Sequence, residues 1–341
     1  MGARVDITPP ENPLFWDVRG DHTLELPVLG LPVQVESNSA YVVGVFEEAF
    51  GVWRNLTREA TGERLRVRVF IHHGAESEGE HATVSHRVPD GRRLLMHTAG
   101  SFAIADPDRR EALAYVSDTL AADREHFRLT MLESLVLALA SQFDRVPLHA
   151  AAIARDGAGV LLAARSGVGK STLAYAAHAA GLPVMSDDTV WVQRSPRSRV
   201  WGMPRRIHLT PGSEQFFPEL ARSTTSVLAN GKVKMVVDLA QRHNGETPLV
   251  VDHVGICLVE RSSGVLSLSR ADPDEVVREL GTRLEPGFSL FAEQTPAYVR
   301  GLVGSFVWRL RLSGHPADAV PLLAAMLDEV SARVTPTAER R

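Results

Sequence analysis

The chain has 341 residues, a length that suits two domains, with 44% hydrophobic and 23% charged residues, as is ordinary for a globular protein. A net charge of −4 gives no basic excess of the kind that nucleic-acid binding requires, and the longest apolar run, residues 135–140, is far too short to cross a bilayer. Acidic residues and prolines precede any apolar run at the N-terminus, so we expect no signal peptide, and the single cysteine, Cys257, suits a reducing cytoplasm.

The first 145 residues predict an α+β domain, which we expect to bind a substrate or a partner. Residues 39–51 have the apolar spacing of a helix and begin at a serine, whereas residues 64–71 alternate as a half-buried strand does. Two more strands are expected on either side of a turn at residues 89–91, followed by two helices. These four elements cover residues 81–88, 92–97, 109–121 and 125–143.

Residues 146–335 predict a second domain with an α/β core, which starts at residues 147–153. An apolar run over residues 159–164 is typical of a buried parallel strand, and an alanine-rich helix over residues 171–180 ends at Gly181. The other predicted elements are strands at 182–186, 189–193, 199–202, 233–239 and 254–260, a helix that begins at Asp272, and a final amphipathic helix over 316–334.

The junction between the apolar strand and the alanine-rich helix carries a phosphate-binding P-loop motif with one substitution. Residues 164–171 match Gly-x-x-x-x-Gly-Lys-[Ser/Thr] except at Ala164, which we expect to end the strand without harm to ATP binding. Backbone N–H groups of this loop are expected to surround a β-phosphate at the positive end of the helix. Lys170 would contact the β- and γ-phosphates, and the Ser171 hydroxyl would hold Mg²⁺. The predicted ATP site comprises Ser166, Gly167, Val168, Gly169, Lys170, Ser171 and Thr172.

Asp187 and Asp188 follow Lys170 by one helix and one short strand. This spacing places both carboxylates at the carboxyl end of a strand beside the P-loop, where ligands bind in open α/β sheets. Phosphoryl transfer by a kinase requires a carboxylate for Mg²⁺ and a group that accepts the hydroxyl proton, and two adjacent aspartates can divide these tasks. Repulsion between them is expected to raise the pKa of one, which favours a proton acceptor.

Lysine is rare in this chain, because only three of its 37 basic residues are lysines. One of the three is Lys170 of the P-loop. The other two, Lys232 and Lys234, are therefore candidates for positions that require a compact ammonium group. Two neighbouring arginines could clamp the γ-phosphate or the acceptor, although an arginine-rich chain places many such residues on its surface. The candidate acceptor or phosphate contacts are Arg205, Arg206, Lys232 and Lys234.

The order of these motifs resembles the catalytic domain of HPr kinase/phosphorylase. Pro147-Leu-His149 comes first, then Ser-Gly-Val-Gly-Lys-Ser171, then Ser186-Asp-Asp188, and the similarity covers roughly residues 145–195. The resemblance implies an α/β fold with a P-loop kinase core of the HPr kinase/PEP carboxykinase type. It further implies that Asp187 takes the proton from a serine hydroxyl, that Asp188 serves the metal, and that His149 hydrogen-bonds to Asp187 and tunes it.

The chain departs from that family in three places. Ala164 replaces a glycine, a Glu-Ile-Arg-Gly-Leu-Gly segment that helps to fix the metal and the oligomer is missing, and the first 145 residues do not match the family's N-terminal domain. HPr as acceptor, phosphorolysis and a hexamer are therefore not implied. The chain is more similar to HPr-kinase-related proteins of peptide natural-product pathways, some of which phosphorylate a serine of a precursor peptide.

The sequence thus predicts a cytoplasmic Mg²⁺/ATP-dependent serine or threonine kinase whose acceptor is a peptide or small protein. Two alternatives stay open: a kinase for a small hydroxylated metabolite on the same core, and a nucleotide-dependent regulatory module without transfer activity. Slow ATP turnover that is independent of any acceptor would favour the regulatory module. Neither nucleic acid nor a membrane is expected as a partner, and self-association is left open.

Overall fold

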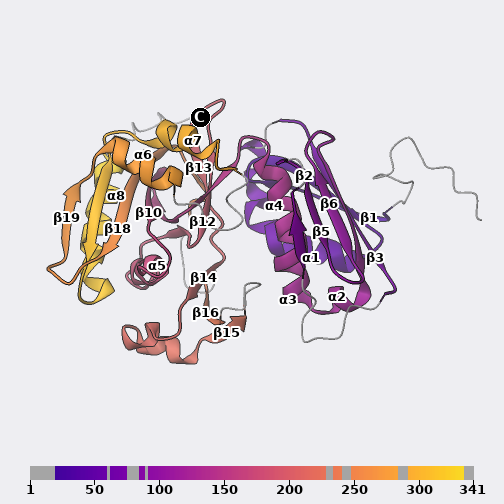
Figure 1. Cartoon of the computed structure of the whole chain (residues 1–341), viewed down its shortest axis with the longest axis horizontal. Coiled ribbons are helices and arrows are strands. Elements are labelled where there is room, and N and C mark those ends of the chain that lie inside the picture. The colour runs from indigo at the N-terminus through magenta and orange to yellow at the C-terminus, as the bar shows by residue number, and fades with distance from the viewer. Residues whose placement is uncertain are drawn as a thin grey trace, which may run out of the picture. The chain divides into compact units, whose positions relative to one another are not determined.

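The computed structural model of the chain divides into two compact units, Met1–Phe143 and Asp144–Arg341 (Figure 1). The described residues are 20–59, 62–74, 84–88, 91–227, 233–239, 247–282 and 291–333. Within them, both units combine helices with strands, and the strands form several sheets, so the chain is a mixed α/β protein. None of the described helices is both long and apolar enough to cross a membrane.

The first unit is built on a seven-stranded sheet in the order β1-β2-β3-β7-β6-β5-β4. Its strands β2, β3 and β7 run parallel, and the remaining neighbours pair antiparallel. The elements are β1 (His22–Val28), β2 (Leu31–Ser37), α1 (Ala40–Phe50), η1 (Gly51–Glu59), β3 (Leu65–His72), β4 (Ser85–Arg87), β5 (Leu94–His97), β6 (Phe102–Asp106), β7 (Glu111–Ser117), α2 (Asp118–Ala122), α3 (Arg124–His126), η2 (Phe127–Glu133) and α4 (Ser134–Ser141).

The helix predicted over residues 109–121 is wrong, because most of that segment is the central strand β7. Glutamate, alanine and leucine favour a helix, but Ala112 and Ala114 are fully buried between β3 and β6, and such packing overrides a weak local propensity. The predicted helix 39–51 and strand 64–71 are confirmed by α1 and β3. Residues 81–83 and 89–90, part of a predicted strand and turn, lie outside the described residues.

The second unit contains a six-stranded sheet in the order β11-β9-β10-β18-β20-β19 and two smaller sheets, β17-β13-β12-β8 and β14-β16-β15. Its strands are β8 (Val146–His149), β9 (Ala151–Arg155), β10 (Ala158–Ala163), β11 (Val184–Ser186), β12 (Thr189–Gln193), β13 (Arg199–Trp201), β14 (Arg206–Leu209), β15 (Thr224–Val227), β16 (Val233–Asp238), β17 (Val250–Val251), β18 (His253–Arg261), β19 (Ser267–Arg270) and β20 (Val307–Leu312). Its helices are α5 (Lys170–Ala179), η3 (Ser213–Gln215), η4 (Pro218–Arg222), α6 (Pro273–Thr282), α7 (Thr295–Leu302), η6 (Pro316–Ala319) and α8 (Val320–Ser331).

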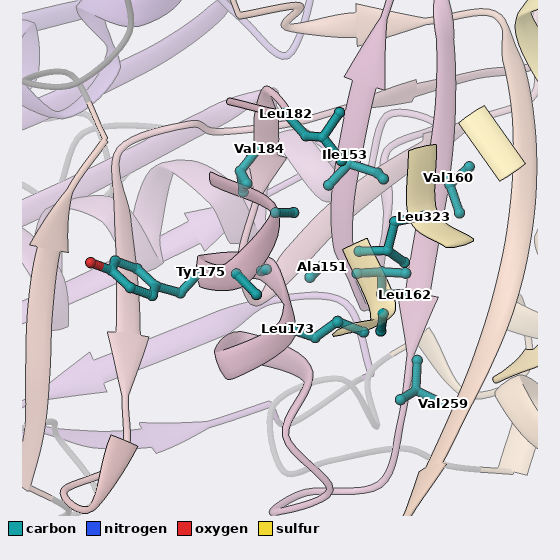
Figure 2. Packing of buried hydrophobic residues seen from close by; sticks show 14 of the residues in the cluster. Ala151, Ile153, Val160, Leu162, Leu173, Tyr175, Leu182, Val184, Val259 and Leu323 are labelled. Atoms are coloured by element: carbon teal, nitrogen blue, oxygen red, sulfur yellow. The ribbon is translucent and has the colours of Figure 1, made fainter. Parts of the chain in front are cut away.

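Both faces of the six-stranded sheet are covered, which explains why β10 is apolar along its whole length. Alternate residues of β9, β10 and β18 enter opposite cores. One core includes α5, α8 and buried residues of β14 and β16, and Figure 2 shows Leu162 of β10 beside Leu173 of α5 and Leu323 of α8. The other core includes α6, α7 and the β17-β13-β12-β8 sheet.

The predicted strand–loop–helix order around residue 170 is confirmed. β10 pairs parallel with β18 and antiparallel with β9, and it leads through residues 164–169 into α5. Gly181, with φ +85°, ends α5, and the N–H of Leu182 donates to the Ala177 carbonyl at 2.9 Å. The predicted cap of α6 is also confirmed, because Asp272 Oδ1 accepts the N–H of Asp274 at 2.7 Å.

Candidate functional site

Two chain segments pass from one sheet to another at the same place in the second unit. Strand β8 ends at His149 and the chain enters β9 of the large sheet, whereas β11 of the large sheet ends at Ser186 and leads through two aspartates into β12. Because β8 and β12 pair antiparallel with His149 opposite Thr189, the histidine lies beside the residue that precedes Thr189. His149 Nδ1 is 3.4 Å from Asp188 Oδ1.

The two aspartates of this crossing have opposite environments. Asp187 is 3% exposed, and its Oδ2 accepts the backbone N–H of His208 at 2.8 Å. The side chain of Asp188 is 59% exposed. The chain bends at these two residues between β11 and β12, and one carboxylate is turned inwards and its neighbour outwards.

Burial raises the pKa of Asp187, and the charge of Asp188 adds to this shift, although Lys170 and the hydrogen bonds to the carboxylate oppose it. Asp188 behaves differently. Partial burial would raise its pKa too, but the positive charges of Lys170 and His149 lower the pKa of Asp188 below its ordinary value. The buried carboxyl is thus the harder one to ionise, and the exposed carboxyl is ionised at neutral pH.

Removing the buried charge should stabilise the ligand-free protein. A carboxyl with a raised folded-state pKa contributes most stability below its unfolded pKa and loses that contribution as pH rises through the folded value. Asp187→Asn mimics the protonated form, so we expect a higher Tm than wild type at neutral pH and no difference at acid pH. Each kcal/mol gained is worth about 2–4 °C in a unit of this size, which calorimetry across pH resolves. An equal or lower Tm at neutral pH would contradict this expectation.

Lys170 connects the first turn of α5 to both aspartates. Its side chain is 7% exposed, and Nζ donates to the Asp187 carbonyl at 3.0 Å and lies 3.4 Å from Asp188 Oδ1. A buried ammonium group is stable only with such partners. The contact brings the end of the loop that precedes α5 against the crossing between the sheets.

The loop before α5, residues 164–169, is called the glycine loop below. Gly167 and Gly169 have φ values of +82° and +112°, which residues with a Cβ rarely adopt. Gly169 is also approached closely, because a Cβ there would lie 3.3 Å from a guanidinium nitrogen of Arg261. Arg261 Nε donates to the Val168 carbonyl at 3.0 Å, so this arginine at the end of β18 fixes the loop.

Ala164 is the residue that departs from the glycine-loop motif. It is 6% exposed, belongs to the core beneath α5, and is not one of the non-glycine residues with positive φ. We therefore expect Ala164→Gly to change ATP affinity less than two-fold and to lower stability by about 0.5–1 kcal/mol, because glycine loses more chain entropy on folding. Nucleotide titration and urea unfolding of both proteins measure the two effects. A large change in ATP affinity would refute the expectation.

A cavity of about 570 Å³ lies between the glycine loop, the aspartates and β14. It brings together most of the residues predicted from the sequence: Ser166, Gly167, Gly169, Lys170, Ser171, Thr172, Asp187, Asp188, His149 and Lys234. Arg205, Arg206 and Val168 are not among the described residues that line it, and Lys232 lies outside the described residues. Lys234 reaches the cavity from β16 and donates to Thr210 Oγ1 at 2.9 Å.

The sequence alone missed several residues of the cavity wall, namely Arg165, His208, Thr210, Gln215, Phe216 and Arg261. A signal existed for Arg261, because the carboxyl ends of parallel strands meet at one edge of a sheet and β18 is the parallel neighbour of β10. The sequence signal for strand β14 was weak, because the strand has only four residues and only two of them, Ile207 and Leu209, are buried apolar residues.

The site fits a divalent cation that a nucleotide brings with it. Asp187 Oδ1 is buried without a hydrogen-bond partner, and the Ser171 hydroxyl lies close enough to this carboxylate to lower its pKa. The described residues contain no cluster of three or more His, Cys, Asp or Glu side chains that could hold a metal by themselves. Mg²⁺ in phosphoryl-transfer sites is bound by one or two carboxylates and by substrate phosphates, a requirement that Asp187 and Ser171 meet.

No protein-family model and no curated protein matches the chain. Among solved structures, the HPr(Ser) kinase/phosphatase from Coxiella burnetii is similar with a TM-score of 0.29 and 10% sequence identity, over 54% of this chain and 94% of that chain. A TM-score this low assigns neither a fold family nor an activity.

Proposed function

We propose that the second unit is a Mg²⁺/ATP-dependent kinase that transfers the γ-phosphoryl group to a serine or threonine hydroxyl of a peptide or small protein. The observation that carries this proposal is the pair of unlike carboxylates beside the glycine loop. Asp187 is buried with an unpartnered oxygen, and Asp188 is exposed in the same cavity. A site that only binds a nucleotide needs a carboxylate for the metal, such as the buried Asp187. Transfer to a hydroxyl also needs an accessible carboxylate that can accept the proton, such as Asp188.

The glycine loop supplies the binding part of the proposed mechanism. Its backbone N–H groups and the N-terminus of α5 favour a β-phosphate, and Lys170 is expected to exchange its contacts with the aspartates for the β- and γ-phosphates. Mg²⁺, held by Ser171 and Asp187, would neutralise charge that develops on the transferred group. Arg261 at the glycine loop adds a second positive charge on the same side.

We assign the proton acceptor to Asp188 and the metal side to Asp187, which exchanges the roles implied by the family resemblance. The raised pKa of Asp187 taken alone would favour that carboxyl as the proton acceptor. Access decides instead, because a general base must first come within hydrogen-bond reach of the acceptor hydroxyl. Asp187 is 3% exposed and directed towards Ser171, whereas Asp188 is 59% exposed beside His149. The proton of the acceptor hydroxyl would pass to Asp188. At the same time the hydroxyl oxygen would bond to the γ-phosphorus, and the bond between that phosphorus and the bridging oxygen of ADP would break. His149 would orient the Asp188 carboxylate.

The test of this function is the detection of a product. The full chain is incubated with ATP, Mg²⁺ and a pool of serine- and threonine-containing peptides, and mass spectrometry identifies any peptide that gains one phosphoryl group. A phosphopeptide whose formation depends on Mg²⁺ supports the proposal. Phosphorylation of small polyols but not of peptides would favour the metabolite kinase, and ATP turnover unaffected by any acceptor would favour a regulatory module.

A further inference from the structure

Phe216 is the only large apolar side chain among the described residues that line the cavity. The cavity wall otherwise consists of charged, hydroxyl, amide and imidazole side chains, glycines and one proline. Phosphates, Mg²⁺ and an acceptor hydroxyl all require such polar groups. A purine base is the part of ATP that requires an apolar surface, because its flat faces stack favourably on aromatic rings.

The position of Phe216 is fixed by His315. The Nδ1 atom of His315 accepts the N–H of Ala317 at 3.1 Å, which places the proton of the neutral ring on Nε2. Nε2 then donates to the Phe216 carbonyl at 2.9 Å, and the two rings meet edge to face with centroids 5.5 Å apart. Phe216 is half-buried, packs against the core beneath α5 as well as against His315, and lines the cavity.

The same segment is attached to α5, the helix that begins at the glycine loop. Phe217 packs edge-on against Tyr175 of α5 with centroids 4.8 Å apart, and the Tyr175 hydroxyl donates to Glu219 at 2.9 Å. The His315 ring also meets the Phe217 ring edge to face, with the two ring centroids 5.4 Å apart. These contacts hold Phe216 at a constant position relative to the first turn of α5, as a preorganised binding surface requires.

The chemistry of transfer fixes the end of the cavity at which the base must lie. The attacking and leaving oxygens are roughly in line on opposite sides of the γ-phosphorus. The acceptor lies at Asp188, so the diphosphate and nucleoside extend away from it. Thr172 in the first turn of α5 lines the same cavity as Ser213, Gln215 and Phe216.

We propose that Phe216 is the platform on which the base of ATP stacks, and that the acceptor enters at the opposite end of the cavity, beside Asp188 and His149. This inference rests on the proposed function, because it assumes that the glycine loop binds the triphosphate. It assigns a nucleoside subsite to a residue outside every motif of the sequence.

The experiment compares two ligands that differ only in the nucleoside. Calorimetry in Mg²⁺ measures the affinity of the full chain for ATP and for inorganic tripolyphosphate, with wild type, Phe216→Leu and Phe216→Tyr. Leucine keeps apolar volume and removes the π face, so we expect about ten-fold weaker ATP binding and unchanged tripolyphosphate binding. Tyrosine keeps the ring and should bind ATP like wild type. Phe102→Leu, the same change at a 42% exposed ring of the first unit, is the matched control.

Each other outcome overturns the inference in a recognisable way. If Phe216→Leu binds ATP as wild type does while retaining its Tm, the base does not stack on this ring. If both ligands weaken equally, Phe216 supports the phosphate-binding loop rather than the base. If wild type binds neither ligand, the proposed function fails, and the nucleoside subsite fails with it.

Discussion

Asp188→Asn is expected to lower the rate of phosphoryl transfer by about 10²–10⁴-fold, the usual contribution of a positioned general base. The variant keeps the shape of the site but cannot accept a proton. ATP affinity should stay the same or rise slightly, because the variant also removes a negative charge 3.4 Å from Lys170 Nζ. Single-turnover kinetics at saturating ATP measures the rate, and calorimetry measures the affinity.

Asp187→Asn is the matched control for this prediction, since it makes the same change one residue earlier. It should weaken the dependence of ATP binding on Mg²⁺ as well as lower transfer. If Asp187→Asn instead retained Mg²⁺-dependent binding and lost transfer, while Asp188→Asn transferred at the normal rate, the roles implied by the family resemblance would be restored.

Lys170→Ala should have the second largest effect, with transfer about 10²–10³-fold slower and ATP binding strongly weakened. The variant removes the ammonium group that is expected to stabilise charge on the γ-phosphoryl group. It also removes the positive charge that lowers the pKa of both neighbouring carboxylates, Asp187 and Asp188. The defect should therefore appear in both binding and rate.

Lys170→Arg separates charge from shape at this position. Lys170 is 7% exposed and donates to the Asp187 carbonyl, a space that suits a compact ammonium better than a planar guanidinium. We expect this variant to recover little of the lost activity. Normal transfer by Lys170→Ala, measured under the same conditions, would show that the glycine loop has no part in the reaction.

The elements around the site could be predicted from the sequence because local signals agreed with the packing. The apolar run of β10, the glycines of the loop and Gly181 at the end of α5 each have one physical explanation, and all three are found. The segment Glu111–Ser117 shows the opposite case. Its residues favour a helix, and only the two neighbouring strands of the sheet make it a strand.

The geometry of the two aspartates could not be predicted, although their presence could. Nothing in an Asp-Asp pair indicates which side chain turns inwards. That choice depends on the pairing of β8 with β12, which places His149 beside Asp188, and on β14 of another sheet, whose His208 N–H lies beside Asp187. Phe216 was missed for a similar reason, because its place in the cavity depends on His315, ninety-nine residues further along the chain.

The most direct test of the proposed function compares product formation with ATP binding in the same two proteins. Wild type and Asp188→Asn are mixed with ATP, Mg²⁺ and the peptide pool, and phosphopeptides are quantified by mass spectrometry after one turnover. We expect both proteins to bind ATP in the presence of Mg²⁺ and only wild type to form phosphopeptide at an appreciable rate. Wild type that binds no ATP, or Asp188→Asn that forms phosphopeptide as fast as wild type, would contradict it.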